Sequence, residues 1–397
     1  MIKDGMTRNR IVTRDFLIAM TILMCCSMNF FLILINLQDF VQDRFGGSAF
    51  EAGVAAGLYV FGGITSRVLF GKYIELIGRK RMLTVALFLA VLASLAYFVV
   101  PSLALLFVLR FAHGMTYGIA SACTTDIVSK LIPPERRGEG LSYYFIGATV
   151  STAIGPFLGL ELTSEGGYGT LFAVGAGMYI LACILSLIIR VPEETLTEEQ
   201  KRDARSFSFS NLVQVAALPI SLVCMVFFFA YSSIHTFIAA YSESMDLAVM
   251  AGSFYIASAA GSLTSRMTTG RIYDTKGPNG IITVGYVCFA SGMFMFSRTS
   301  DISIFILCGF MIGYGMSLVF AVCQTIAIST SDATRYGVTV STFNGLTDFG
   351  TGIGPMILGL VLTAFGFRDM YLICTFIALA SLVMYWLVHG FRTVRRT

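Results

Sequence analysis

Three side chains that could do chemistry stand at helical spacing inside one long apolar stretch of this 397-residue sequence. Arg110 is followed at i+3 by His113 and at i+7 by Tyr117, so all three share one face of a helix. An arginine stays protonated even in apolar surroundings and must find an anion, a dipole or water. The group therefore indicates a path for protons or substrate, or else a permanent ion pair that only joins two helices.

A carboxylate lies in similar surroundings near the end of the chain. Asp348 follows Asn344 at i+4, near the middle of an apolar stretch, where an acid is neutral, paired or beside a wet cavity. We expect Asp348 to bind and release protons, with Arg110 and His113 acting in the same circuit. Asp39, near the outer end of the first apolar stretch, is a second proton-binding candidate and equally an ordinary interfacial acid.

Polar and aromatic side chains within apolar helices are the candidate substrate ligands. Asn29 and Asn36 share a face with Asp39 when plotted at about 100° per residue. Tyr231 and His235 share another face, where a buried aromatic beside a hydrogen-bonded histidine is an equally good interpretation. The predicted substrate-binding residues are Asn29, Asn36, Tyr117, Tyr231, His235 and Asn344.

The composition indicates that helices in a lipid bilayer position these residues. Charged residues make up 13% of the chain and hydrophobic residues 56%, with a mean hydropathy of +0.78, whereas soluble domains carry roughly 25% charged residues. A spanning helix needs about 20 mostly apolar residues. We therefore expect an all-α integral membrane protein with twelve spans, at residues 16–40, 50–71, 82–100, 103–127, 140–162, 168–190, 212–241, 249–270, 280–298, 302–329, 336–364 and 368–390.

The basic residues predict how these spans are oriented. Of the 27 Lys and Arg, Arg44, Arg298 and Arg368 fall on one side and Arg110 lies within a span, while the others gather on the opposite side. The positive-inside rule then places both termini in the cytoplasm of a multi-pass cell-membrane protein. The predicted organisation is a six-helix bundle at 1–190, a polar cytoplasmic linker at 191–211 and a second six-helix bundle at 212–397.

The sequence shows no sign of an enzyme, a cofactor site or a metal site. Nine cysteines all fall inside predicted spans without a C-x-x-C pair, so they are most simply small packing residues. Walker, G-x-S-x-G and H-E-x-x-H motifs are absent. The net charge of +4 follows from the topology and does not indicate nucleic acid.

The chain repeats itself without gaps at an offset of 199 residues. Paired positions fall on the second, fourth and fifth spans of each half, which predicts two parallel six-helix bundles with a substrate path where they meet. The repeated residues are Gly62, Thr65, Ser66, Arg67, Gly71, Gly78, Gly114, Gly138, Ser142, Ile154, Gly155 and Pro156, which recur as Gly261, Thr264, Ser265, Arg266, Gly270, Gly277, Gly313, Gly337, Ser341, Ile353, Gly354 and Pro355.

Three motifs at the expected helices give the sequence a resemblance to the major facilitator superfamily, and in particular to its twelve-helix drug–proton antiporter branch. The loop motif between the second and third helices is matched by Gly71, Glu75, Gly78, Arg79 and Lys80, with Leu76 where a base is usual. "RFAHGMTYG" resembles the fourth-helix motif through Arg110, Gly114 and Gly118, with His113 in place of Gln. "GATVSTAIGPFLG" resembles the fifth-helix antiporter motif through Gly147, Gly155, Pro156 and Gly159.

The resemblance implies a gate at the charged loop. The position of Glu75 joins a network in the family that closes the cytoplasmic side, and Asp126, at the cytoplasmic end of the fourth helix, is a possible partner of the loop's basic residues. Gly71 and Gly78 permit the tight turn, while Arg79 and Lys80 anchor it. A purely topological basic loop is the alternative. The predicted gating residues are Gly71, Glu75, Gly78, Arg79, Lys80 and Asp126.

The glycine–proline motif indicates the direction of transport. Pro156 and Pro355 each remove a helical hydrogen bond and favour a kink, and glycines nearby let helices approach closely. In the family this motif accompanies exporters. The predicted helix-kink residues are Gly147, Gly155, Pro156, Gly159, Gly354 and Pro355.

The combined prediction is a secondary transporter that exports a small amphipathic compound in exchange for protons. Its partners are the small-molecule substrate, protons and membrane lipids, without a cofactor or nucleic acid, and the chain is expected to act as a monomer. Two alternatives stay open: proton-coupled import of a polar solute, and a lipid or glycolipid flippase with a lateral opening between helices five and eight.

Overall fold

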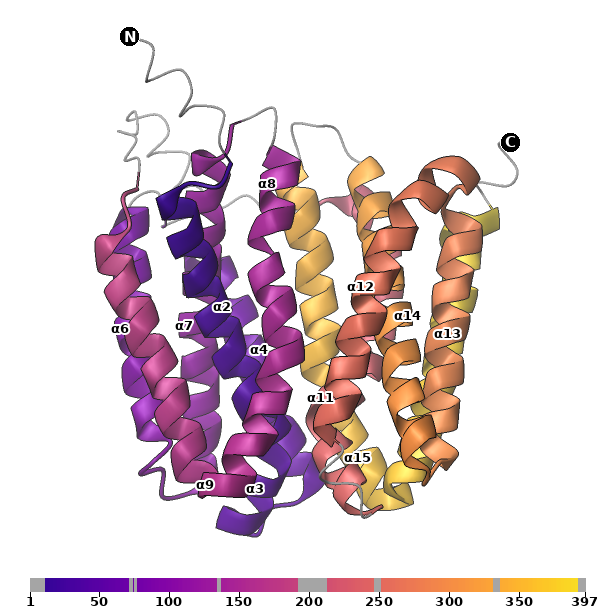
Figure 1. The fold of residues 1–397 in the computed structure, drawn as a ribbon, viewed down its shortest axis with the longest axis horizontal. Coiled ribbons are helices and arrows are strands. Elements are labelled where there is room, and N and C mark those ends of the chain that lie inside the picture. Colours follow the sequence, from indigo (N-terminus) through magenta and orange to yellow (C-terminus); the bar gives the residue numbers. More distant parts are fainter. Residues whose placement is uncertain are drawn as a thin grey trace. The chain divides into compact units, whose positions relative to one another are not determined.

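The computed structural model describes residues 11–70, 74, 77–133, 137–191, 213–245, 251–330 and 336–391, and every element within these ranges is a helix (Figure 1). The elements are α2 (Arg14–Ile35), α3 (Leu37–Phe45), α4 (Ala49–Phe70), α6 (Arg79–Ala96), α7 (Leu103–Leu131), α8 (Arg137–Tyr144), α9 (Ile146–Ile188), the short 3₁₀ turn η3 (Val215–Ala217), α11 (Leu218–Glu243), α12 (Ala251–Lys276), α13 (Pro278–Arg298), α14 (Ile302–Ser329), α15 (Tyr336–Tyr385) and the π-helical turn η6 (Trp386–Gly390).

These helices correspond to the predicted spans. Within the described ranges, eight segments are long and apolar enough to cross a membrane. Two of them, Ile146–Ile188 and Val338–Gly390, have 43 and 53 residues, and about 20 suffice for one crossing. Their backbones leave helical angles at Gly167 and Gly366, so each holds two crossings. The two remaining predicted spans, 82–100 and 249–270, correspond to α6 and α12, which are not among these eight segments.

The first span is shorter than the sequence predicted. We placed it at 16–40, but α2 ends at Ile35, and Asn36 leaves the helix with φ −96° and ψ 2° before α3 begins at Leu37. The polarity of this region explains the difference, because α3 carries Asp39 and other charged residues and has no apolar run long enough to continue the span. Asp39 therefore lies outside the candidate spans.

The described chain forms two compact units. The first unit contains the chain through Leu34 and from Phe61 to Phe207, and the second contains Ile35–Val60 and the chain from Ser208. Within the first unit, α6 packs against both α7 and α9, and apolar side chains of α2, α6, α7 and α9 form its buried core. This division assigns the segment Ile35–Val60 to the second unit, whereas the residues directly before and after it in the chain belong to the first.

The second unit has its own network of packed helices. α15 packs against α11 and α13, while α14 packs against α12 and α13. Buried rings fill the space between them; Phe296, for example, lies 4.8 Å from Tyr371 and 5.3 Å from Phe254, measured between ring centroids. Aromatic contacts of this kind stabilise a packed core beyond the burial of area.

Glycines at repeat-related positions set the helix–helix distances in both units. A β-carbon on Gly62 of α4 would lie 2.1 Å from the carbonyl oxygen of Phe111 on α7. A β-carbon on Gly261 of α12 would lie at the same 2.1 Å from the carbonyl oxygen of Phe310 on α14. Both pairs are related by the offset of 199, so the two halves share one helix-packing geometry as well as one sequence pattern.

The backbone breaks repeat in the same way. Gly78 and Gly277 have φ of 98° and 73°, and Gly167 and Gly366 have φ of 66° and 81°, each pair again 199 residues apart. Gly167 and Gly366 combine this φ with ψ of −173° and 174°, a region that is essentially restricted to glycine. These two residues therefore allow each long helix to reverse without an intervening loop.

We predict that Gly167→Ala destabilises the protein by about 1–3 kcal/mol through backbone strain alone. No atom lies within 4 Å of a β-carbon at Gly167, so a steric clash does not contribute. Thermal unfolding of the purified protein in detergent would measure the change. Gly169→Ala is the matched control, because it has the same open space and no positive φ. Equal losses for both variants would contradict a role for the backbone conformation.

Candidate functional site

A buried polar cluster lies in the first unit around Arg110 and His113. Both side chains are fully buried on α7. The Arg110 guanidinium donates through one terminal nitrogen to the Tyr97 hydroxyl at 3.3 Å, and the same hydroxyl lies 3.2 Å from Nδ1 of His113. Tyr97 follows the last residue of α6 as its C-cap. The Tyr97 hydroxyl thus links the Arg110 guanidinium to the His113 imidazole.

The second half of α9 lines this cluster. Phe172 stacks against Tyr97 at 5.3 Å, and Tyr179 lies 5.2 Å from His113, both measured between ring centroids. Gly175 shares their helical face, and Asn29 of α2 reaches it: a β-carbon on Gly175 would lie 2.5 Å from Nδ2 of Asn29. The rings of Phe172 and Tyr179 therefore border the cluster, and Gly175 between them leaves space for the side chain of Asn29.

Asn29 is the least satisfied polar side chain at this place. It is fully buried, and neither its amide nitrogen nor its amide oxygen has a hydrogen-bond partner among the described residues. A buried amide without partners costs about 1–3 kcal/mol, so such groups need an explanation. The sequence predicted Asn29 as a substrate ligand, and the structure places it against α9 inside the first unit.

At the positions of the second unit that correspond to Tyr97 and Arg110, the residues are apolar. Tyr97 corresponds to Phe296, and Arg110 corresponds to Gly309. A β-carbon on Gly309 would lie 2.6 Å from the carbonyl oxygen of Phe254, so that site is closed by helix packing. Both units nevertheless contain the ring pair, with the hydroxyl on the other ring. Tyr97 and Phe172 of the first unit correspond to Phe296 and Tyr371 of the second, whose ring centroids are 4.8 Å apart. At these paired positions the charge belongs to the first unit.

Tyr117 lies on the same helix as the cluster and contacts a different neighbour. Its ring is half-buried and stacks on Phe30 of α2, with centroids 6.1 Å apart and an angle of 25° between the planes. Tyr117 thus contacts α2, while Arg110 and His113, at helical spacing from it, contact Tyr97 at the end of α6.

Tyr231 and His235 pack into the second unit. Their rings meet edge to face at 4.8 Å, and His235 stacks at 6.1 Å on Tyr255 of α12. Both side chains are buried. The structure therefore shows aromatic packing at this pair, and its role in substrate binding stays a prediction.

The remaining substrate-binding and proton-coupling candidates belong to the second unit. Asn344 and Asp348 are half-buried, one turn apart on the first half of α15. Asn36 is buried at the start of α3, where its carbonyl accepts a hydrogen bond from the amide of Phe40. Asp39 follows on the same helix. The predicted proton circuit thus draws on residues of both units, and its connection stays a prediction.

The glycine–proline motifs place the fifth and eleventh spans against the first helix of their own half. A β-carbon on Gly155 would lie 2.8 Å from Cβ of Phe31 on α2, and one on Gly354 would lie 2.7 Å from the carbonyl oxygen of Phe229 on α11. Gly147 likewise faces α2, and Gly159 is buried. The helices continue through Pro156 and Pro355, where a kink stays a prediction, and their backbones leave helical angles farther on, at Gly167 and Gly366.

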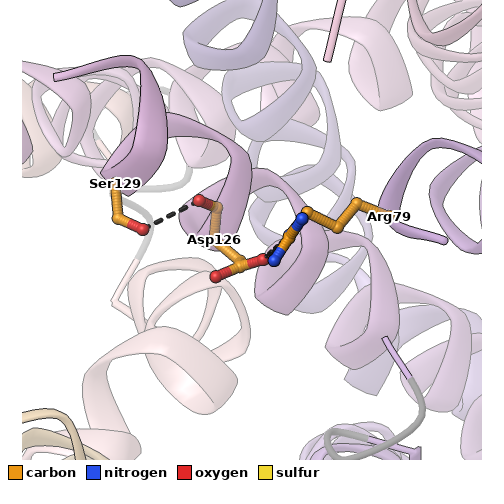
Figure 2. Close-up of polar contacts among 3 residues, drawn as sticks. All are labelled: Arg79, Asp126 and Ser129. Atoms are coloured by element: carbon orange, nitrogen blue, oxygen red, sulfur yellow. Dashed lines mark hydrogen bonds and ion pairs between the residues drawn. The ribbon is translucent and has the colours of Figure 1, made fainter. Parts of the chain in front are cut away.

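The charged loop of the first half is tied to α7 by an ion pair. Arg79, at the start of α6, binds the carboxylate of Asp126, whose backbone carbonyl accepts a hydrogen bond from Ser129 at 2.8 Å (Figure 2). The sequence had named Asp126 as a possible partner of these bases. Arg79 is 7% exposed and Asp126 is 31% exposed, so the pair is partly shielded from solvent. Gly71 and Glu75 lie outside the described residues.

A second attachment of this loop was not predicted. Lys80 donates to the carbonyl oxygens of Leu187 at 2.8 Å and Ile189 at 2.9 Å. Its ammonium group thus caps the C-terminal end of α9. Its counterpart Asn279 donates to the carbonyl oxygen of Gly390 at 3.3 Å and accepts from Tyr385 at 2.7 Å. The offset of 199 links Lys80 to Asn279, and this is the signal that could have revealed the shared role.

The fold and these repeated contacts define a helical membrane protein built from two related halves, and comparison with known proteins gives its family. The model of the Major Facilitator Superfamily matches residues 19–300 and 281–396. The chain therefore belongs to the major facilitator superfamily, whose members are transporters and not enzymes.

Similar proteins include exporters. The staphylopine export protein of Staphylococcus aureus is 21% identical over 84% of this chain and 86% of its own length. The multi-drug resistance efflux pump PmrA of Streptococcus pneumoniae is 24% identical over 64% of this chain and 65% of its own length. The crystal structure of the nucleoside transporter NupG has a TM-score of 0.73 at 11% identity, over 94% of this chain and 99% of that one, and shows the shared fold.

We predict that Arg110 and Tyr97 are energetically coupled. Tyr97→Phe removes a partner from both Arg110 and His113 and should destabilise the protein by about 1–3 kcal/mol. Arg110→Lys, which loses the planar fork, should destabilise it less in the Tyr97→Phe background than in the wild type. A double-mutant cycle on thermal unfolding in detergent measures this coupling. Additive losses would show that the 3.3 Å contact does not hold the cluster together.

Proposed function

We propose that this transporter exports a small amphipathic compound in exchange for protons. The observation that carries the proposal is the similarity to two exporters along most of the chain. The glycine–proline motif, with Gly155 and Gly354 each packed against the first helix of its half, supports the same direction. The sequence contains no nucleotide-binding motif, so a gradient of ions or solutes is the expected energy source.

The proton-coupling residues in this proposal are Asp348, Arg110 and His113, with Asp39 as the alternative acid. In this proposal Asp348 carries the transported proton, and Arg110 cannot do so because it does not release its own. The guanidinium instead supplies a fixed positive charge in the first unit, and a cationic substrate would disfavour proton binding to the same acid. Competition of proton and substrate for one carboxylate is sufficient to exchange them across the membrane.

The substrate-binding residues in this proposal come from both units. Asn29 supplies a buried amide with unused donors and acceptors, and Tyr117 supplies a half-buried ring. Asn36, Tyr231, His235 and Asn344 complete the predicted set. An amide and aromatic rings together suit an amphipathic compound with a polar group and an apolar body.

The ion pair of Arg79 and Asp126 is the proposed core of a cytoplasmic gate. Its position supports this role, because it joins the start of α6 to the last turns of α7. Glu75, Gly71, Gly78 and Lys80 belong to the same proposed gate. In the second half Pro278 replaces Arg79 and Thr325 replaces Asp126, so the gate is expected in one half only.

We predict that Asp348→Asn abolishes exchange of protons for substrate. Everted membrane vesicles, acidified by respiration and reporting internal pH through a fluorescent weak base, would be challenged with a panel of amphipathic cations and zwitterions. Wild-type vesicles should release protons on addition of a transported compound, and Asp348→Asn vesicles should not, because an amide cannot be protonated at these pH values.

Glu161→Gln is the control for this experiment, since Glu161 is an exposed acid on α9 and should leave proton release unchanged. Full proton release by the Asp348→Asn protein would exclude Asp348 as the coupling acid and make Asp39 the next candidate. Proton uptake on addition of a polar solute would favour import, and inactivity toward every soluble compound would favour a lipid substrate.

We further propose a cell-membrane location with both termini in the cytoplasm, on the basis of the distribution of Lys and Arg. Single cysteines in the 191–211 linker, of which residues 192–211 lie outside the described ranges, should react with an impermeant maleimide only after the cells are opened. A cysteine at Ser300, on the opposite side, should react in intact cells. The reverse pattern would overturn this orientation.

A further inference from the structure

Two further polar side chains belong to the buried cluster of the first unit. Asn29 of α2 reaches α9 at Gly175, on the helical face whose rings border the cluster. Ser94 lies one turn before Tyr97 on α6 and therefore shares its face. We call the following five residues, all of the first unit, the extended cluster: Asn29, Ser94, Tyr97, Arg110 and His113.

The two added side chains have no hydrogen-bond partner within the described ranges. Asn29 is 0% exposed, and both its amide nitrogen and its amide oxygen are unsatisfied there. Ser94 is 1% exposed, and its hydroxyl is unsatisfied as well. A buried polar group without a partner destabilises a protein, and native structures usually satisfy it with water, an ion or a ligand. Two such residues in one cluster therefore indicate a bound component.

The second half of the chain shows that the fold does not require these polar groups. At the offset of 199, the five positions of the extended cluster are occupied by Phe228, Met293, Phe296, Gly309 and Ile312. The helices α12 and α14 nevertheless approach each other as closely as α4 and α7 do. Polar residues at all five positions of one half, and at none of the other, indicate a function of the first half rather than a need of helix packing.

The permanent charge of the extended cluster is positive, because Arg110 keeps its proton. The described acids of the first unit lie in other places: Asp15 in the first turn of α2, Asp126 near the end of α7, and Glu161 and Glu165 exposed on α9. In surroundings of low dielectric constant, a positive charge attracts an anion far more strongly than in water. A component that completes the cluster is therefore expected to be an anion.

Burial limits the size of that anion. Asn29, Arg110 and His113 are each 0% exposed, so an anionic group attached to a large organic body has no room beside them. The donors available are an amide, a guanidinium and a hydroxyl, which all bind a compact anion without regard to its shape. Burial and donor types together favour a free ion of about the size of a water molecule.

We propose that the extended cluster binds one small inorganic anion of the halide class, held by Asn29, Ser94 and Arg110. Chloride is the abundant member of that class. The ion neutralises the charge of Arg110 inside an apolar region, where an uncompensated charge is costly. This site is additional to the proposed exchange of substrate and protons. In this assignment Asn29 holds the ion, and its place among the substrate ligands is the alternative that the experiment separates.

Anion binding can be measured without substrate and without any gradient, so its failure is distinct from failure of the proposed antiport. Purified transporter in detergent would be exchanged into sodium gluconate, whose organic anion is too large for the buried cluster. It would then be titrated with sodium chloride, bromide or acetate at constant ionic strength. An ion that binds only the folded state raises the unfolding temperature as its concentration rises. A scintillation proximity assay with radioactive chloride gives the affinity directly.

Wild-type protein should bind chloride and bromide, and its unfolding temperature should rise with either ion. Asn29→Leu separates a ligand site from a structural role. This change removes a buried unsatisfied amide and keeps the volume similar, so the unfolding temperature in gluconate should rise. Chloride binding should weaken by about tenfold, because one hydrogen bond to a charged group is lost.

Gly175→Ala is a second variant, which changes none of the donors. Its β-carbon would lie 2.5 Å from Nδ2 of Asn29 and would displace the amide, so chloride binding should weaken. Ser186→Ala is the matched control, a buried serine of α9 that donates to the carbonyl of Cys183 at 2.7 Å and to the hydroxyl of Thr84 at 3.1 Å. It should lower the unfolding temperature and leave the response to chloride unchanged.

Three results would overturn the proposal. If neither the unfolding temperature nor bound radioactivity of the wild-type protein depends on chloride, the extended cluster holds no halide. A response to acetate without one to chloride would replace the halide site by a carboxylate site, which suits a substrate with that group. A full response to chloride in both Asn29→Leu and Gly175→Ala would place the ion elsewhere in the protein.

Discussion

The close approach of helix backbones is the constraint on which the rest of this structure depends. In lipid, apolar side chains gain little by leaving the solvent, so helices associate through van der Waals packing and small residues. Gly62 and Gly261 bring α4 onto α7 and α12 onto α14 at the same distance. Because the contacts are made through backbone carbonyls, the geometry persists in both halves while most side chains around it have changed.

That shared geometry makes the difference in polarity between the units meaningful. The first unit buries Arg110 with Tyr97 and His113, and the second unit fills the corresponding place with Phe296, Gly309 and its neighbours. A permanent charge in an apolar region is expensive and is retained only with partners. The two units thus differ in polarity: the first contains the buried Arg110, and the second contains packed rings and the half-buried Asp348.

The fold was predictable because its signals are local. Twenty-residue apolar runs and the offset of 199 depend on chain order alone, and glycines such as Gly78 and Gly277 marked the turns. Asp126 could be named as a partner of the basic loop because a helix end and a short loop have few ways to meet. The break at Asn36 was missed because a polar residue near a helix end is equally compatible with continuation of the span.

The partners within the cluster could not be read from the spacing of residues. Tyr97 and Tyr179 lie on other helices than Arg110, and their approach depends on how α6, α7 and α9 pack. The repeat did hold one clue, since Tyr97 with Phe172 reappears as Phe296 with Tyr371, the same ring pair with an exchanged hydroxyl. The grouping of the segment Ile35–Val60 with the second unit had no comparable signal, because it arises from contacts between residues far apart in the chain.

The glycine reversals at Gly167 and Gly366 have a consequence for how the protein is made. Each joins two membrane crossings without an irregular segment between the helices, so the second crossing leaves the ribosome directly after the first. Until the second helix of such a pair arrives, the C-terminal end of the first helix is either buried in lipid or exposed to water. Insertion of the two as a helical hairpin avoids that state, which makes the hairpin the unit of biogenesis at these two points of the chain.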